Sequence, residues 1–130
     1  MAAKRKKKQG PKQNGWVYVI KIWLKGEVLL KIGTTNRNPN TRAIEIATQC
    51  LELFGEIPRM RVVGSKQVRE NYAVEKELLD RTAKYTFVPD ERLHGYSEFR
   101  RMGEVDLLKE FTNCVNKAYP AVKPPELICM

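Results

Sequence analysis

The chain of 130 residues has a single histidine, three widely separated cysteines and no long apolar run. One histidine excludes multi-histidine metal centres and makes a histidine-activated serine or cysteine nucleophile a poor candidate. Cys50, Cys114 and Cys129 form no C-x-x-C pair, so no zinc site is indicated. Their odd number, without a signal peptide, predicts reduced thiols in the cytoplasm. Lysines interrupt the early apolar stretch, so we expect no contact with a membrane.

Acidic side chains are absent from the first twelve residues, which hold six of the 24 basic ones in a chain of net charge +9. Residues 1–14 are predicted to form a disordered basic arm, which would bind a polyanion by releasing condensed counterions. We expect a nucleic acid, DNA before RNA, because no amphipathic anchor or lipidation pattern accompanies the lysines. The alternative is a solubilising tail. The basic residues of the arm are Lys4, Arg5, Lys6, Lys7, Lys8 and Lys12.

The rest of the chain predicts one α/β (α+β) domain over residues 15–118, followed by a proline-containing tail over residues 119–130. Strands are expected over residues 16–24 and 28–32, joined as an antiparallel hairpin, and over residues 56–63. Helices are expected over residues 41–53, 65–84 and 104–118. The fold would be a small three-stranded antiparallel sheet flanked by helices.

Glu75 is the clearest chemical signal in the second predicted helix. At about 100° per residue, it falls near the centre of a stripe with Val68, Tyr72, Leu79 and Thr82. A carboxylate that faces the sheet needs a cation partner or a metal, because burial of an unpaired charge is costly. The alternative is a rim glutamate, or a plain ion pair with a lysine.

Tyr18 on the first strand, the K-I-G block that ends at Gly33, Arg42 on the first helix and Glu75 resemble the GIY-YIG nuclease superfamily in their order. The chain is most similar to the branch typified by a phage T5 reading frame and the fungal meiotically up-regulated domain. Its pattern K-I-G-x-T-x-x-x-P-x-x-R is matched from Lys31 to Arg42. Residues 72–75 and 95–99 resemble the helix glutamate and the closing small-x-Glu-aromatic element of that branch. Lysine replaces the tyrosine of the second motif.

This resemblance implies hydrolysis of a phosphodiester in a shallow positive cleft, leaving a 5′-phosphate and a 3′-hydroxyl. Glu75 would hold one Mg²⁺ or Mn²⁺, and Arg42 would clamp the scissile phosphate. Tyr18 would orient or deprotonate the attacking water if cations lower its pKa, and Lys31 would tune that pKa or relay the proton. The alternatives are a packing role for Tyr18, a surface position for Lys31 and a pair with Glu45 for Arg42.

Other site candidates lie in the loops. Gly33 is expected to let the backbone approach the substrate. Asn36 and Arg37 are expected to contact phosphate. Several members of the superfamily hold phosphate with a late asparagine that has no counterpart here. Further candidates are Ser97 or Glu98, which would stand in for that asparagine, and His94, which would replace a histidine of the first helix.

Two other functions stay open. The lysine in the second motif and the missing asparagine would suit a catalytically inactive nucleic-acid-binding module on the same scaffold. A regulatory protein-interaction domain of phage type would use the cleft residues as a structural ion pair. No recognition module is appended, so high specificity would require a homodimer or a partner. The resemblance places the protein in the cytoplasm of a bacterial or phage-infected cell.

Overall fold

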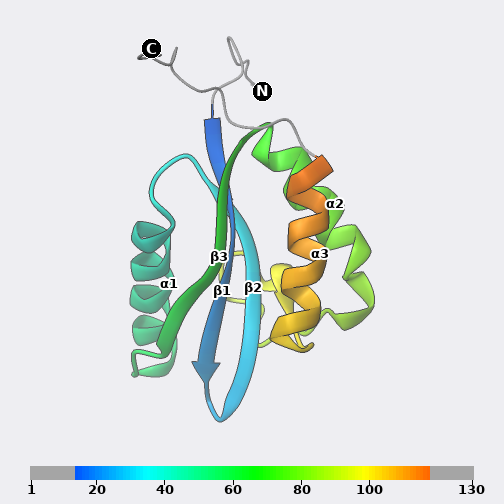
Figure 1. The fold of residues 1–130 in the computed structure, drawn as a ribbon. Helices are drawn as coiled ribbons and strands as arrows, with labels where there is room; N and C mark the ends of the chain where they lie inside the picture. The colour runs from blue at the N-terminus through cyan, green and yellow to red at the C-terminus, as the bar shows by residue number, and fades with distance from the viewer. Residues whose placement is uncertain (1–13, 118–130) are drawn as a thin grey trace, which may run out of the picture.

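The computed structural model describes residues 14–117, and nearly all of the predicted basic arm and the whole proline-containing tail lie outside the described residues. One sheet has helix α1 on one face and helices α2 and α3 on the other (Figure 1). Within the described part, no helix is long and apolar enough to cross a bilayer. The elements are β1 (Asn14–Leu24), β2 (Glu27–Thr35), α1 (Pro39–Phe54), β3 (Arg59–Arg69), α2 (Asn71–Arg81), the 3-10 turns Ala83–Tyr85 and Tyr96–Glu98, β4 (Phe99–Arg100) and α3 (Glu104–Lys117).

The sheet is antiparallel with strand order β3-β1-β2-β4. The predicted hairpin of β1 and β2 is confirmed, with a two-residue turn at Lys25 and Gly26, which both have positive φ angles (53° and 79°). The predicted count of three strands is wrong, because β4 adds a fourth. This strand is only two residues long and pairs with Leu30 and Lys31. It is too short to leave a periodic pattern in the sequence.

The central strand β1 is buried on both faces, which explains its nearly continuous apolar sequence. Val17 and Val19 belong to the core cluster under α2 and α3. Tyr18, Ile20 and Ile22 alternate with them and belong to the cluster that includes Ile46 of α1. Helix α1 therefore covers the face toward which Tyr18 points.

The boundary between β3 and α2 differs from the prediction. Residues 65–69 continue β3 rather than beginning a helix, and the chain turns at Glu70, whose φ angle is 56°. Because β3 is an edge strand, one of its sides carries polar residues that resemble the start of an amphipathic helix. The predicted stripe on the second helix is accordingly wrong, since Val68 is a strand residue and Tyr72 is 64% exposed.

Arg100 fastens the irregular segment between α2 and β4 to the core. Its guanidinium is buried and donates hydrogen bonds to the Thr82 hydroxyl (2.8 Å) and to the carbonyls of Ser97 (2.9 Å) and Leu79 (3.1 Å). These acceptors lie on both sides of the irregular segment, so one side chain fixes its two ends.

Replacement of Arg100 by Met is expected to lower the free energy of unfolding by on the order of 3 kcal/mol, because buried acceptors lose a charged donor. Arg101→Met is the matched control, since Arg101 is about half exposed and pairs with Glu27. It should cost less than about 1 kcal/mol. Denaturant titration of both variants measures the difference, and equal losses would show that Arg100 is not the anchor.

Candidate active site

Tyr18 and Lys31 lie on adjacent strands and turn toward the same face of the sheet. Both are almost fully buried, each with 1% exposure. The Lys31 ammonium is 6.0 Å from the centre of the Tyr18 ring. The predicted phenol and amine are therefore neighbours, which follows from the hairpin register that sets Tyr18 opposite Gly33 and Ile20 opposite Lys31.

Gly33 makes room for the phenol. A Cβ atom at this position would collide with the hydroxyl and the ring of Tyr18. The strand also continues past Gly33 to Thr35. The structure gives this glycine a further role, which is to leave room for the Tyr18 side chain. The expected approach of its backbone to a substrate stays a prediction.

Arg42 reaches the phenol from the first turns of α1. The helix begins at Pro39 with Asn38 as its N-cap, where the Asn38 side chain accepts a hydrogen bond from the Asn40 amide (2.7 Å). The Arg42 guanidinium donates to Glu45 (2.8 Å) and also contacts the Tyr18 hydroxyl.

The pKa of Tyr18 does not meet the condition for a base, which was that neighbouring cations lower it. Burial raises it to about 12, although the charge of Arg42 and a hydrogen bond from Arg42 oppose the shift. Desolvation thus outweighs the neighbouring cation. At neutral pH, Tyr18 is therefore a neutral phenol that can donate and accept hydrogen bonds.

Glu75 approaches Lys31 from α2, on the other face of the sheet. This approach is open because β4 pairs with β2 only at Leu30 and Lys31, which leaves the rest of that edge of β2 free. Burial raises the pKa of Glu75 to about 7, and the charge of Glu98 adds to the rise, while Lys31 and a hydrogen bond with Thr34 oppose it.

Glu98 is the direct partner of Lys31. Its carboxylate accepts a hydrogen bond from the ammonium at 2.6 Å. Burial lowers the pKa of Lys31, and the Glu98 charge counteracts this. Gly95 opens the 3-10 turn that carries Glu98. Its φ angle is 70°, and a Cβ atom there would collide with both the Glu98 carboxylate and the Lys31 ammonium.

The structure thus brings the four central candidates together from four different elements: Tyr18 from β1, Lys31 from β2, Arg42 from α1 and Glu75 from α2. Around them, three cations (Lys31, Arg42 and Arg37) face three carboxylates (Glu45, Glu75 and Glu98). The site was expected to be positive, but its charges are nearly balanced.

The loop candidates take different places. Arg37 is exposed and pairs with Glu45 (2.6 Å). Asn36 is exposed near Gly15, at the start of β1. His94 lines an open hollow of about 310 Å³ that Arg42 also lines. The Ser97 side chain is exposed, and its carbonyl is a partner of Arg100. The basic residues of the arm lie outside the described residues.

The alternative considered for Arg42, a pair with Glu45 three residues later, is confirmed, and Glu45 also pairs with Arg37. Sequence reasoning missed two other residues of the site. Thr34 contacts Glu75, and its place in the K-I-G-x-T segment does not reveal this contact. Gly95 begins the turn that carries Glu98. Its role depends on the position of that turn beside Lys31, which the local sequence does not reveal.

The donor atoms suit magnesium or manganese better than zinc. Within residues 14–117, no three His, Cys, Asp or Glu side chains gather into a possible metal-binding group. Magnesium keeps several waters and needs only one or two carboxylates, whereas zinc takes four protein ligands in structural sites and three in catalytic ones. Glu75 and the adjacent Glu98 supply carboxylate oxygens, which are ligands that magnesium prefers.

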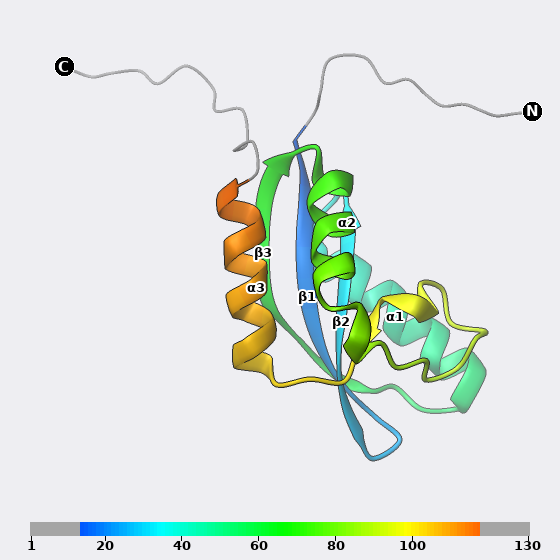
Figure 2. The same ribbon diagram turned by 90° about the vertical axis from the view of Figure 1, so that its right-hand side faces the viewer.

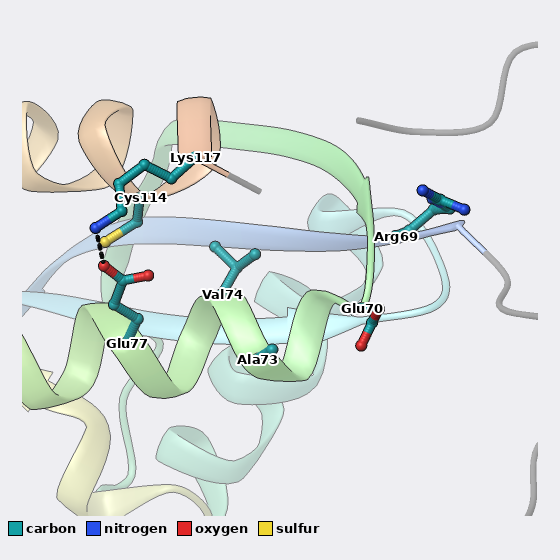
Figure 3. Close-up of a pocket in the computed structure, with 7 residues that line it drawn as sticks. All are labelled: Arg69, Glu70, Ala73, Val74, Glu77, Cys114 and Lys117. Atoms are coloured by element: carbon teal, nitrogen blue, oxygen red, sulfur yellow. Dashed lines mark hydrogen bonds and ion pairs between the residues drawn. The ribbon is translucent and has the colours of Figure 1, made fainter. Parts of the chain in front are cut away.

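A second hollow of about 170 Å³ lies away from this site. It is formed by the end of β3, by α2 and by the end of α3, and the ion pair of Glu77 and Lys117 (2.8 Å) lies beside the buried Cys114 (Figure 3). None of the predicted site residues lines it, so we do not count it as part of the candidate active site.

Comparison with known proteins identifies the domain. Residues 15–119 match the family model of the T5orf172 domain. The chain belongs to the T5orf172 domain family. It matches no curated protein and no solved structure. Membership in the T5orf172 family is compatible with a nuclease-type function, and the match covers all of the described site residues.

Glu75→Gln should make the protein more stable than the wild type at about pH 8. The folded pKa of about 7 lies above the ordinary 4.5, so the folded state binds more protons than the unfolded state between these values. The cost of the buried charge is therefore absent below about pH 4.5 and complete above about pH 7. Denaturant titrations at several pH values should show the advantage of the variant growing over this interval.

Glu45→Gln is the matched control on the same cleft. Hydrogen bonds from Arg37 and then Arg42 lower the pKa of Glu45. Its charge therefore stabilises the fold above its ordinary pKa, and this contribution disappears as the pH falls through the lowered value. Glu45→Gln should be less stable than the wild type at about pH 8. The raised pKa of Glu75 would be contradicted if Glu75→Gln were no more stable than the wild type at about pH 8.

Proposed function

We propose that this T5orf172 protein is a divalent-metal-dependent endonuclease of the GIY-YIG type, which hydrolyses a phosphodiester of DNA. The convergence of Tyr18, Lys31, Arg42 and Glu75 from four separate elements carries the proposal. A phenol, an amine, a guanidinium and a carboxylate gathered at one sheet edge supply the groups that this hydrolysis requires.

Glu75, with Glu98 beside it, is the group that would hold Mg²⁺ or Mn²⁺, which neutralises charge on phosphoryl oxygens when bound. Arg42 presents a planar donor fork toward the Tyr18 hydroxyl, and this fork suits two oxygens of a phosphate. The Glu45 carboxylate accepts a hydrogen bond from the Arg42 guanidinium (2.8 Å) and helps to fix its position. The substrate phosphate would thus lie between α1 and the open edge of β2.

Tyr18 and Lys31 would have different roles toward the attacking water, orientation for Tyr18 and proton transfer for Lys31. A phenol whose pKa is about 12 is a poor base at neutral pH, so Tyr18 would orient the water by hydrogen bonding. Burial lowers the pKa of Lys31, which makes the amine the better proton acceptor of the two once its ion pair with Glu98 opens. This division would explain how lysine serves where the second motif usually has tyrosine.

Nicking of supercoiled plasmid in Mg²⁺ or Mn²⁺ tests the proposal. The wild type should nick the plasmid, and chelation of the metal should abolish nicking. Glu75→Ala should slow nicking at least about 100-fold, because the variant lacks the carboxylate that would hold the metal against the charge of the transition state. Glu77→Ala is the matched control, since Glu77 lies on the same helix and pairs with Lys117 at the surface. A wild type without activity, or equal activity of Glu75→Ala and Glu77→Ala, would refute the proposal.

A catalytically inactive nucleic-acid-binding module is the second candidate, and the tight pair of Lys31 with Glu98 favours it. For such a module we expect binding that weakens with salt, no nicking in either metal, and unchanged or improved affinity of Glu75→Ala. Fluorescence anisotropy from about 50 to about 200 mM salt measures the affinity. Nicking that depends on Glu75 would exclude the module.

A further inference from the structure

The hairpin end of the sheet carries basic side chains on the face opposite Tyr18 and Lys31. Lys21 and Trp23 alternate with the residues of β1 that turn toward α1. The Lys21 ammonium pairs with Glu104 (2.9 Å) at the start of α3, which places Lys21 on the α3 face. Arg61 and Arg59 stand opposite Lys21 and Trp23 on β3. We name these four residues, Lys21, Trp23, Arg59 and Arg61, the hairpin-end patch.

Helix α3 does not cover this patch. The hairpin of β1 and β2 projects beyond the first turn of α3 (Figure 2). Arg59 and Arg61 are both exposed, whereas the intervening Met60 packs against the core on the α1 side. The patch is therefore a solvent-facing continuation of the sheet surface that α2 and α3 cover elsewhere.

The patch is built around one indole. The guanidinium of Arg59 lies 4.5 Å from the centre of the Trp23 ring, and the Lys21 ammonium lies 5.0 Å from it. A guanidinium stacked on an indole is held in a plane, so it loses less conformational entropy when it binds a phosphate. This arrangement orients Arg59 before any ligand arrives.

Arg59 and Arg61 differ from the other exposed arginines in their lack of acidic partners. Neither forms an ion pair within residues 14–117, whereas an acidic partner is present for Arg37, Arg81, Arg92 and Arg101. Residues 14–117 contain 17 basic and 14 acidic side chains, an excess of three. The charges of Arg59 and Arg61 are thus not neutralised by an ion pair within residues 14–117.

We propose that the hairpin-end patch binds phosphates of a nucleic-acid segment outside the candidate active site. This inference rests on the proposed function, because both require a nucleic-acid partner. Arg59 and Arg61 are two residues apart on one strand, so their side chains leave the same face roughly 7 Å apart. This separation is comparable to that of neighbouring phosphates in a nucleic-acid backbone, and such contacts would not depend on base sequence.

Binding of a fluorescent duplex, measured without divalent metal over a range of salt concentrations, tests the inference. Arg59→Gln combined with Arg61→Gln should reduce the slope of log K against log salt by about 1.8, since each lost phosphate contact contributes about 0.9. The matched control is Lys76→Gln combined with Arg81→Gln, which removes the same charge from α2. Both control residues are ion-paired, so the control should keep the slope of the wild type.

Equal slopes for the two double variants would overturn the inference, and the patch would then serve another class of partner. That result would leave the proposed function intact if the wild type still nicks plasmid in a Glu75-dependent way. A wild type that binds no duplex at about 50 mM salt would overturn both. Unfolding midpoints of the double variants should match each other, because all four substituted residues are exposed.

Discussion

The buried ammonium of Lys31 needs a counter-charge, and the pair that it makes with Glu98 holds the site together. An unpaired lysine at 1% exposure would cost several kcal/mol, or would lose its proton. The carboxylate at 2.6 Å prevents this only because the turn that begins at Gly95 brings it over β2. Arg100 in turn secures that segment to the core. The pair therefore ties the most irregular part of the chain to the centre of the sheet.

The short strand β4 has a consequence for the chemistry. Because it covers β2 at only two residues, the remaining edge of β2 stays open for a side chain from the opposite layer. Glu75 uses this opening, so two carboxylates face one ammonium. Burial is the main reason that the pKa of Glu75 rises to about 7, and the charge of the adjacent Glu98 adds to the rise, so the site disfavours two charged carboxylates beside one ammonium. An additional cation would resolve this conflict, and a divalent metal or the cationic part of a partner would supply it.

Interactions between residues close in the sequence could be predicted, and those between distant residues could not. The hairpin register followed from local pattern, and it placed Tyr18 beside Lys31 on one face. The pairing of Lys31 with Glu98 joins residues 67 positions apart, so no local pattern encodes it. The start of α2 was misplaced because residues 65–69 at the end of the edge strand β3 are mostly polar, as the first turn of a surface helix also is. The direction of the Tyr18 pKa shift could not be predicted because burial competes with Arg42, and only the packed structure shows which effect is larger.

The charge balance of the cleft bears on how a nucleic acid would be attracted. Because carboxylates offset Lys31, Arg37 and Arg42, the cleft alone would exert little long-range pull on a polyanion. The attraction would have to come from cations elsewhere on the chain. Two candidates are the guanidiniums of the hairpin-end patch and the six basic residues of the predicted N-terminal arm, which lie outside the described residues. Binding of the nucleic acid and its hydrolysis would then depend on different residues. Substitutions in the arm or the hairpin-end patch should alter affinity, and substitutions in the candidate active site should alter turnover.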